Sequence, residues 1–102
     1  MLKELAEEGA AIADLCRRFE VRRLAVFGSA TTDEFVPNQS DVDFLVEFDR
    51  SGSLSRFDAY FGLKEGLEEL LGRPVDLVAP SALDNPYFAE SVEHTRKELY
   101  AA

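Results

Sequence analysis

The chain has little cysteine, methionine or positive charge, and it lacks tryptophan and any long hydrophobic run. Its 102 residues include one cysteine, one methionine and no tryptophan. A single cysteine excludes an internal disulfide and favours a reducing compartment, so we expect a cytoplasmic protein. No apolar run approaches the length of a membrane span. The charges spread through residues 2–19 indicate a helix in water rather than a secretion signal, so we expect no membrane partner.

Acidic residues outnumber basic residues, with 20 Asp and Glu against 11 Lys and Arg and a net charge of −9. Such a surface repels nucleic-acid phosphates, so we expect no direct nucleic-acid partner. It would also repel a free nucleotide unless cations neutralise the carboxylates nearby. The length and the apolar fraction of 46% fit one soluble domain spanning residues 1–102.

Hydrophobic periodicity predicts an α/β (α+β) fold in which helices flank a small mixed sheet of three strands. The predicted elements run in the order α-β-turn-β-α-β-α: helix 2–19, strand 22–27, turn-rich connection 29–40, strand 41–48, helix 56–71, strand 75–79 and a last helix from 86. Ser55 and Asn85-Pro86 are expected to cap the second and third helices, and Gly72 to end the second. The stripe of the last helix comprises Phe88, Val92, Thr95 and Leu99. Cys16 lies on the apolar stripe of the first helix and should be buried rather than reactive.

The lengths of the connections predict how the strands pair. About a dozen turn-rich residues join the first two strands, which favours antiparallel pairing. A full helix joins the second strand to the third, which favours a parallel, right-handed crossover. Asp41 and Asp43 open the second strand, and Asp76 lies near the start of the third. We therefore expect the three carboxylates to converge at one sheet edge, beside Gly28-Ser29.

This constellation predicts a site for a divalent cation and a phosphate. Asp41 and Asp43 are two residues apart on a strand, so their side chains share a face and repel unless a cation lies between them. Mg²⁺ takes carboxylate and phosphate oxygens. Asp76 could join a second metal site or act as a base on an incoming hydroxyl. Gly28 permits close approach of a phosphate, and Ser29 adds a backbone N–H and a hydroxyl.

The stretch AVFGSATTDEFVPNQSDVDFLVEF resembles the signature of the DNA-polymerase-beta-like nucleotidyltransferase superfamily, in which Gly-Ser precedes Asp-x-Asp by about ten residues. The sequence from LLGRPVDLV to the last residue is similar to the minimal nucleotidyltransferases, which are often encoded beside a HEPN-domain partner. Carried over by position, the resemblance implies that Gly28, Ser29 and Ser40 bind the nucleotide. It implies that Asp41, Asp43 and Asp76 are the catalytic and metal-binding acids.

The function implied by the resemblance is Mg²⁺-dependent transfer of a nucleoside monophosphate, AMP from ATP, to a hydroxyl of a partner protein. For the minimal subgroup it implies an antitoxin that modifies a HEPN ribonuclease toxin. Family members commonly carry a basic Arg-Gly element after Gly-Ser, and this chain has Ala30 to Glu34 there instead. Arg22, Arg23, Lys64 or Arg73 could supply the missing cation. The alternative is an antitoxin of the same fold that acts by binding and occluding its partner. A homodimer also remains open, as does the acceptor residue.

Overall fold

The structure is a computed structural model that describes residues 2–32 and 41–102. Within these ranges the elements are α1 (Lys3–Glu7), α2 (Gly9–Arg18), β1 (Val21–Phe27), η1 (Gly28–Thr31), β2 (Val42–Phe48), α3 (Arg56–Leu71), β3 (Val75–Val78), η2 (Pro80–Asp84), α4 (Pro86–Thr95) and β4 (Lys97–Ala101). No helix in this part of the chain has the length and apolar character needed to cross a membrane.

The strands of the described residues form one mixed sheet in the order β3-β2-β1-β4. β1 pairs antiparallel with β2, and β2 pairs parallel with β3. Both pairings confirm what the connection lengths predicted. β4 pairs antiparallel with the other edge of β1, so the prediction of three strands was wrong by one strand.

The missed strand comes from the last predicted helix, which ends sooner than its apolar stripe indicated. α4 stops at Thr95, and Arg96 has extended dihedrals of φ −60° and ψ 132°. Leu99 therefore lies in β4 and not on the helix. The physical reason is the unpaired edge of β1, where β4 supplies ladder hydrogen bonds and places Tyr100 opposite Leu24.

The first predicted helix is likewise divided, into α1 and α2. The division falls at Glu8, with φ −101° and ψ 21°, directly before Gly9, a residue with low helix propensity. The backbone N–H of Leu2 donates to the carbonyl of Ala30 at 2.6 Å. This bond ties the start of α1 to the turn that follows β1.

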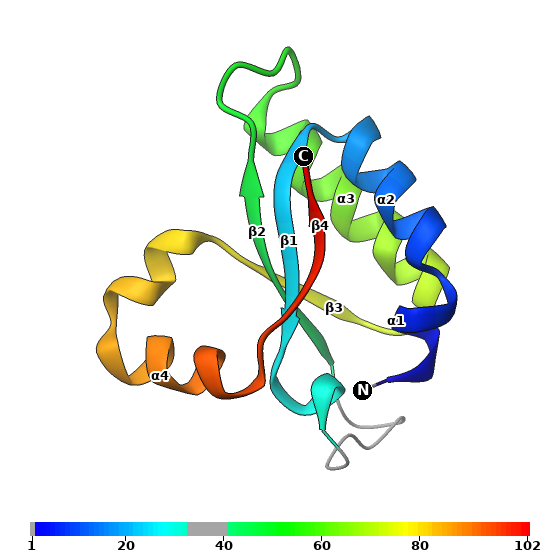
Figure 1. Ribbon diagram of the computed structural model, residues 1–102. Helices are drawn as coiled ribbons and strands as arrows, with labels where there is room; N and C mark the ends of the chain where they lie inside the picture. The colour runs from blue at the N-terminus through cyan, green and yellow to red at the C-terminus, as the bar shows by residue number, and fades with distance from the viewer. Residues whose placement is uncertain (1, 33–40) are drawn as a thin grey trace.

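Helices cover both faces of the sheet, with α2 and α3 on one side and α4 on the other (Figure 1). Alternation along the strands explains the two layers, because successive side chains point to opposite faces. Leu24 and Phe44 belong to the core under α2 and α3. Ala25 and Leu45 belong to a smaller cluster under α4, where Val92 is fully buried.

The predicted helix caps are present. Ser55 Oγ accepts the backbone N–H of Asp58 at 3.0 Å, and Asn85 Oδ1 accepts that of Tyr87 at 3.0 Å. Gly72 ends α3 in the left-handed conformation, with φ 67°. Caps satisfy helix-end groups with short side chains, which is why these boundaries could be predicted from local sequence.

Cys16 is fully buried on α2, as the sequence predicted. Burial raises the pKa of its thiol from 9.0 to about 12. At a given pH the folded protein should therefore contain about a thousandfold less thiolate than the unfolded chain. We expect a thiol reagent at pH 8 to label Cys16 rapidly in denaturant and very slowly without it. Equal labelling rates would contradict this burial.

Candidate active site

The centre of the candidate site is Asp43, which lies between the end of β1 and the start of β3. Asp43 is the register partner of Phe27 in β1 and of Asp76 in β3. Directly paired residues on adjacent strands point their side chains to the same face, and the strands lie about 4.8 Å apart. Asp43 and Asp76 therefore share a face of the sheet, at the end where β2 and β3 both begin.

The negative charges of two other carboxylates act on Asp43. Its pKa is raised above the ordinary value, first by partial burial and then by the negative charges of Asp76 and Asp41. Asp41 itself is exposed, directly before β2. The structure thus places the three acids that the sequence singled out at the same end of the sheet. We call Asp41, Asp43 and Asp76 the carboxylate cluster.

The Gly-Ser turn also lies against the carboxylate cluster. Gly28 has φ +78°, and a Cβ added there would lie 3.0 Å from Oδ2 of Asp43. The turn is held by side-chain hydroxyls: Thr31 Oγ1 donates to the carbonyl of Gly28 at 2.9 Å, and Thr32 Oγ1 donates to that of Ser29 at 3.1 Å. The remaining predicted nucleotide-binding residue, Ser40, lies outside the described residues.

The prediction from sequence missed one residue of this site, Thr95. The backbone N–H of Gly28 donates to Thr95 Oγ1 at 2.8 Å, and Thr95 Oγ1 in turn donates to the carbonyl of Ser91 at 3.4 Å. The last residue of α4 therefore fixes the turn beside Asp43. The sequence placed Thr95 on the apolar stripe of a helix, and no local signal links it to a glycine 67 positions away.

This contact yields a prediction for Thr95→Val, which keeps the shape of the side chain but removes the acceptor. The Gly28 N–H then loses its partner in a partly buried place, so we expect a loss of about 1 kcal/mol in the free energy of unfolding. Nucleotide transfer should also slow, because the turn beside Asp43 is less well held. Thr95→Ser retains the hydroxyl and should behave as wild type in urea denaturation and transfer assays. Equal behaviour of the two variants would contradict the assignment.

Lys64 is one of the basic residues considered as substitutes for the missing Arg-Gly element, and the charge of Asp76 acts on it. Its pKa is raised first by a hydrogen bond to Glu68 and, more weakly, by the charges of Glu68, Tyr60 and Asp76. The arginines make ion pairs elsewhere: Arg22 with Glu47, Arg23 with Glu98 and Arg73 with Glu4. Lys64 Nζ itself lies 2.8 Å from Glu68 Oε2.

The donor set of the cluster suits Mg²⁺ bound together with a substrate. Among the described residues, no three Asp, Glu, His or Cys side chains lie close enough to form a complete metal site by themselves. Mg²⁺ usually takes one or two carboxylates from the protein and further oxygens from phosphate and water, so it does not need such a cage. The mutual repulsion that raises the pKa of Asp43 is what a bound cation would relieve.

A mixed sheet between helices, with acids and a Gly-Ser turn at its strand ends, defines an α/β protein suited to chemistry on phosphates. Comparison with known proteins is consistent with this class. The sequence profile of the nucleotidyltransferase domain matches residues 10–99. The chain therefore belongs to the nucleotidyltransferase domain family, as the resemblance implied, and is an enzyme of nucleotidyltransferase type.

Individual relatives agree with the family assignment. The protein adenylyltransferase MntA of Thermococcus cleftensis is 47% identical over 70 residues, which are 69% of this chain and 67% of that protein. A solved structure designated as a minimal nucleotidyltransferase has 32% identity and a TM-score of 0.72, with 95% of each chain covered.

A more distant match shares only the fold. It is a chain in the structure of a tri-AMPylated Shewanella oneidensis HEPN toxin in complex with an MNT antitoxin. Its TM-score is 0.62 at 21% identity, covering 96% of this chain and 73% of that chain.

Proposed function

We propose that this chain transfers AMP from ATP to a hydroxyl of a HEPN-domain partner protein and so acts as its antitoxin. The observation that carries the proposal is the register of β2 with β1 and β3, which puts Asp43 beside Asp76 and next to Gly28. The 47% identical relative named a protein adenylyltransferase supports the reaction. The complex of a tri-AMPylated HEPN toxin with an MNT antitoxin supports the type of partner.

In the proposed reaction, the acceptor oxygen attacks the α-phosphorus of ATP in line with the bond to the leaving group. A new oxygen–phosphorus bond forms, the bond between the α-phosphorus and its bridging oxygen breaks, and pyrophosphate leaves. A carboxylate of the cluster takes the proton of the acceptor hydroxyl. Ser29 and the backbone of the turn orient the phosphates.

One or two carboxylates of the cluster would hold Mg²⁺. When bound, Mg²⁺ would neutralise phosphate charge and activate the attacking oxygen. The residues themselves contribute position. Partial burial of Asp43 limits solvent screening, so its interaction with a cation is stronger than at the surface. The charge of Asp76 is one cause of the raised pKa of Lys64. The ammonium group of Lys64 offsets part of the negative charge that would repel a triphosphate.

A second candidate function is inhibition by binding alone. It is favoured by the described part of the turn after Ser29, which offers no cation: Ala30 is buried, and the hydroxyls of Thr31 and Thr32 bond to the backbone. A triphosphate there lacks the charge-assisted hydrogen bonds that a basic residue would give.

The experiment that separates the two candidates combines this chain, Mg²⁺ and the protein encoded beside its gene. ATP carries the label either at the α phosphate or at the γ phosphate. AMP transfer predicts that only the α label appears on the partner and that it disappears with the Asp41→Asn/Asp43→Asn variant. A tight complex that acquires no label, and that the double variant leaves intact, would refute transfer and support binding alone.

A further inference from the structure

The first half of α3 presents an apolar surface that no other described part of the chain covers. Among the described residues, the large hydrophobic side chains with high exposure are Leu54 (39%), Phe57 (69%), Phe61 (43%) and Tyr87 (85%). The first three lie at or near the start of α3. The ring centroids of Phe57 and Phe61 are 4.6 Å apart, and those of Tyr60 and Phe61 are 5.0 Å apart. Clustered exposed aromatics mark interaction sites more often than single exposed residues do.

The other sides of α3 are already occupied within the fold. Leu63 and Leu67 are buried in the core under the sheet. Gly62 and Gly66 face α2, where an added Cβ would lie 2.2 Å from the ring of Phe19 and 2.6 Å from Leu15. Phe57 and Phe61 are thus on the side of the helix that remains free for another molecule.

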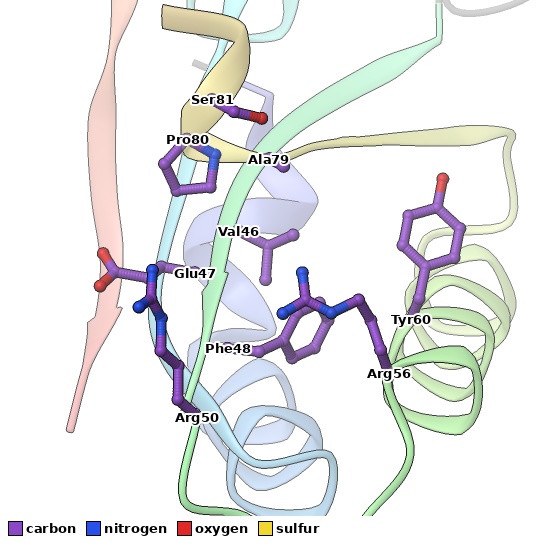
Figure 2. A pocket seen from close by; sticks show the side chains of 9 residues that line it. All are labelled: Val46, Glu47, Phe48, Arg50, Arg56, Tyr60, Ala79, Pro80 and Ser81. Carbon is purple, nitrogen blue, oxygen red and sulfur yellow. The ribbon is translucent and has the colours of Figure 1, made fainter.

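A pocket of about 390 Å³ adjoins this side of α3, between the helix, the end of β2 and the segment after β3 (Figure 2). Its lining includes Phe48, Tyr60, Arg50 and Arg56, and also Glu47, whose carboxylate is paired with Arg22 at 3.5 Å. Figure 2 shows the Arg56 side chain extending from α3 toward the ring of Phe48. None of the acids of the carboxylate cluster lines this pocket.

Arg50 and Arg56 differ from most arginines of this protein in having no carboxylate partner. In residues 2–32 and 41–102, ion pairs occupy Arg17, Arg22, Arg23, Arg73 and Arg96, but none involves Arg50 or Arg56. The chain has nine more acids than bases, and two arginines without an ion pair nevertheless line one pocket. Arginine matches carboxylates with paired hydrogen bonds, so the pocket fits an acidic side chain from outside.

The segment that leads into α3 is fixed in place, which prearranges this surface. The carboxylate of Glu20 accepts the backbone N–H of Ser53 at 2.8 Å and that of Leu54 at 2.6 Å. These bonds lower the pKa of Glu20. A surface that is ordered before binding loses less conformational entropy when a partner docks.

α3 covers the face of the sheet opposite to the side chains of Asp43 and Asp76, and the strand after it, β3, carries one acid of the carboxylate cluster. Two residues of α3 interact with β3. The charge of Asp76 helps to raise the pKa of Lys64, and the carboxylate of Glu68 accepts the backbone N–H of Val75, the first residue of β3, at 3.0 Å. β3 is one of the two edge strands of the sheet, so no strand of the described chain lies beyond it. From Phe57 to Lys64 the helix rises only about 10 Å, a distance that one docked protein spans.

We propose that Leu54, Phe57, Phe61, Arg50 and Arg56 form the docking surface for the protein that receives the nucleotide. The partner places apolar side chains on the aromatic rings and at least one carboxylate on the two arginines. Its acceptor hydroxyl then reaches the carboxylate cluster around the edge strand β3. This inference rests on the proposed function for the identity of the occupant, and it adds the surface and the chemistry by which that occupant is recognised.

The test compares Phe57→Ser/Phe61→Ser and Arg50→Glu/Arg56→Glu with the matched control Tyr87→Ser, which removes an exposed ring outside the surface. Calorimetric titration with the HEPN-domain protein should give a Kd at least tenfold higher for each double variant and an unchanged Kd for the control. The KM for the partner should rise while the KM for ATP stays constant. The Kd of the wild-type complex should rise with salt more steeply than that of the arginine variant.

Several outcomes would overturn the docking surface. An unchanged Kd in both double variants, or no binding of the wild-type chain to the partner, would do so. So would sedimentation of the isolated chain as a dimer that the Phe57→Ser/Phe61→Ser variant converts to monomer, because a second copy would then be the occupant. If the wild-type chain binds but transfers no label, the proposed reaction fails, and the Kd values still decide the docking surface.

Discussion

Replacing Asp43 by asparagine should abolish nucleotide transfer and at the same time raise the melting temperature of the metal-free protein. Loss of a metal-binding carboxylate removes several kcal/mol of transition-state stabilisation, which corresponds to a fall in kcat/KM of roughly a thousandfold. The stability of the Asp43→Asn variant should be higher than that of wild type. The reason is that partial burial and the charges of Asp76 and Asp41 disfavour the ionised form of Asp43 in the folded protein.

The pH dependence of this stabilisation follows from the sign of the pKa shift. The folded-state pKa of Asp43 is raised above the ordinary value of 3.8, so the native state binds the proton more tightly than the unfolded state does. The ionisation of Asp43 therefore lowers the free energy of unfolding of the wild-type protein. This loss begins as the pH rises above about 3.8 and is complete above the folded-state pKa. The melting temperatures of Asp43→Asn and wild type should differ at neutral pH and converge below pH 4 in thermal melts recorded with chelator.

Asp49 provides the matched control, because it follows the opposite end of β2. Its pKa is lowered, first by a hydrogen bond from the Ser51 hydroxyl and then by the Ser51 backbone N–H. Asp49→Asn should therefore leave transfer unchanged and slightly reduce stability at neutral pH. Adding Mg²⁺ and ATP should raise the melting temperature of wild type and of this control, but not of Asp43→Asn. Full activity in Asp43→Asn would refute the role of the cluster.

Gly28→Ala should impair both folding and transfer. The residue has φ +78°, and a non-glycine residue in the left-handed region costs about 1–2 kcal/mol. The added Cβ would also lie 3.0 Å from Oδ2 of Asp43, so the carboxylate must shift. A displacement of catalytic groups by about 1 Å can cost on the order of a hundredfold in rate. Oδ2 of Asp43 has to move by only a few tenths of an ångström, so we expect a smaller but measurable loss of transfer.

Gly72→Ala separates these two effects. Gly72 has a similar φ of +67°, but a Cβ added there meets nothing within 4 Å. Both variants should therefore lose similar stability in urea denaturation, whereas only Gly28→Ala should lose transfer activity. Comparable activity losses in the two variants would show that backbone strain alone, rather than crowding of Asp43, accounts for the result.

The common sheet end of Asp43 and Asp76 could be predicted because the connections between strands favour one direction of pairing each. The turn-rich connection after Ser29 and the helix between β2 and β3 each favoured one direction of pairing, and both directions are present. Direction and strand position together put Asp76 in register with Asp43. By contrast, Thr95 contacts Gly28 across 67 positions of sequence, and neither the residue types nor their spacing predicts such a contact.

The sequence by itself determined which segments bury apolar faces and which acids lie at the starts of β2 and β3. It also determined that Ser55 and Asn85 begin their helices and that Gly72 ends one. These features follow from local periodicity and capping, which act within a few residues. Only the tertiary structure decided that Lys97–Ala101 forms a strand and that α4 holds the turn at Gly28. Both depend on groups far away in the chain, since the open edge of β1 and the unpaired N–H of Gly28 exist only after the sheet has formed.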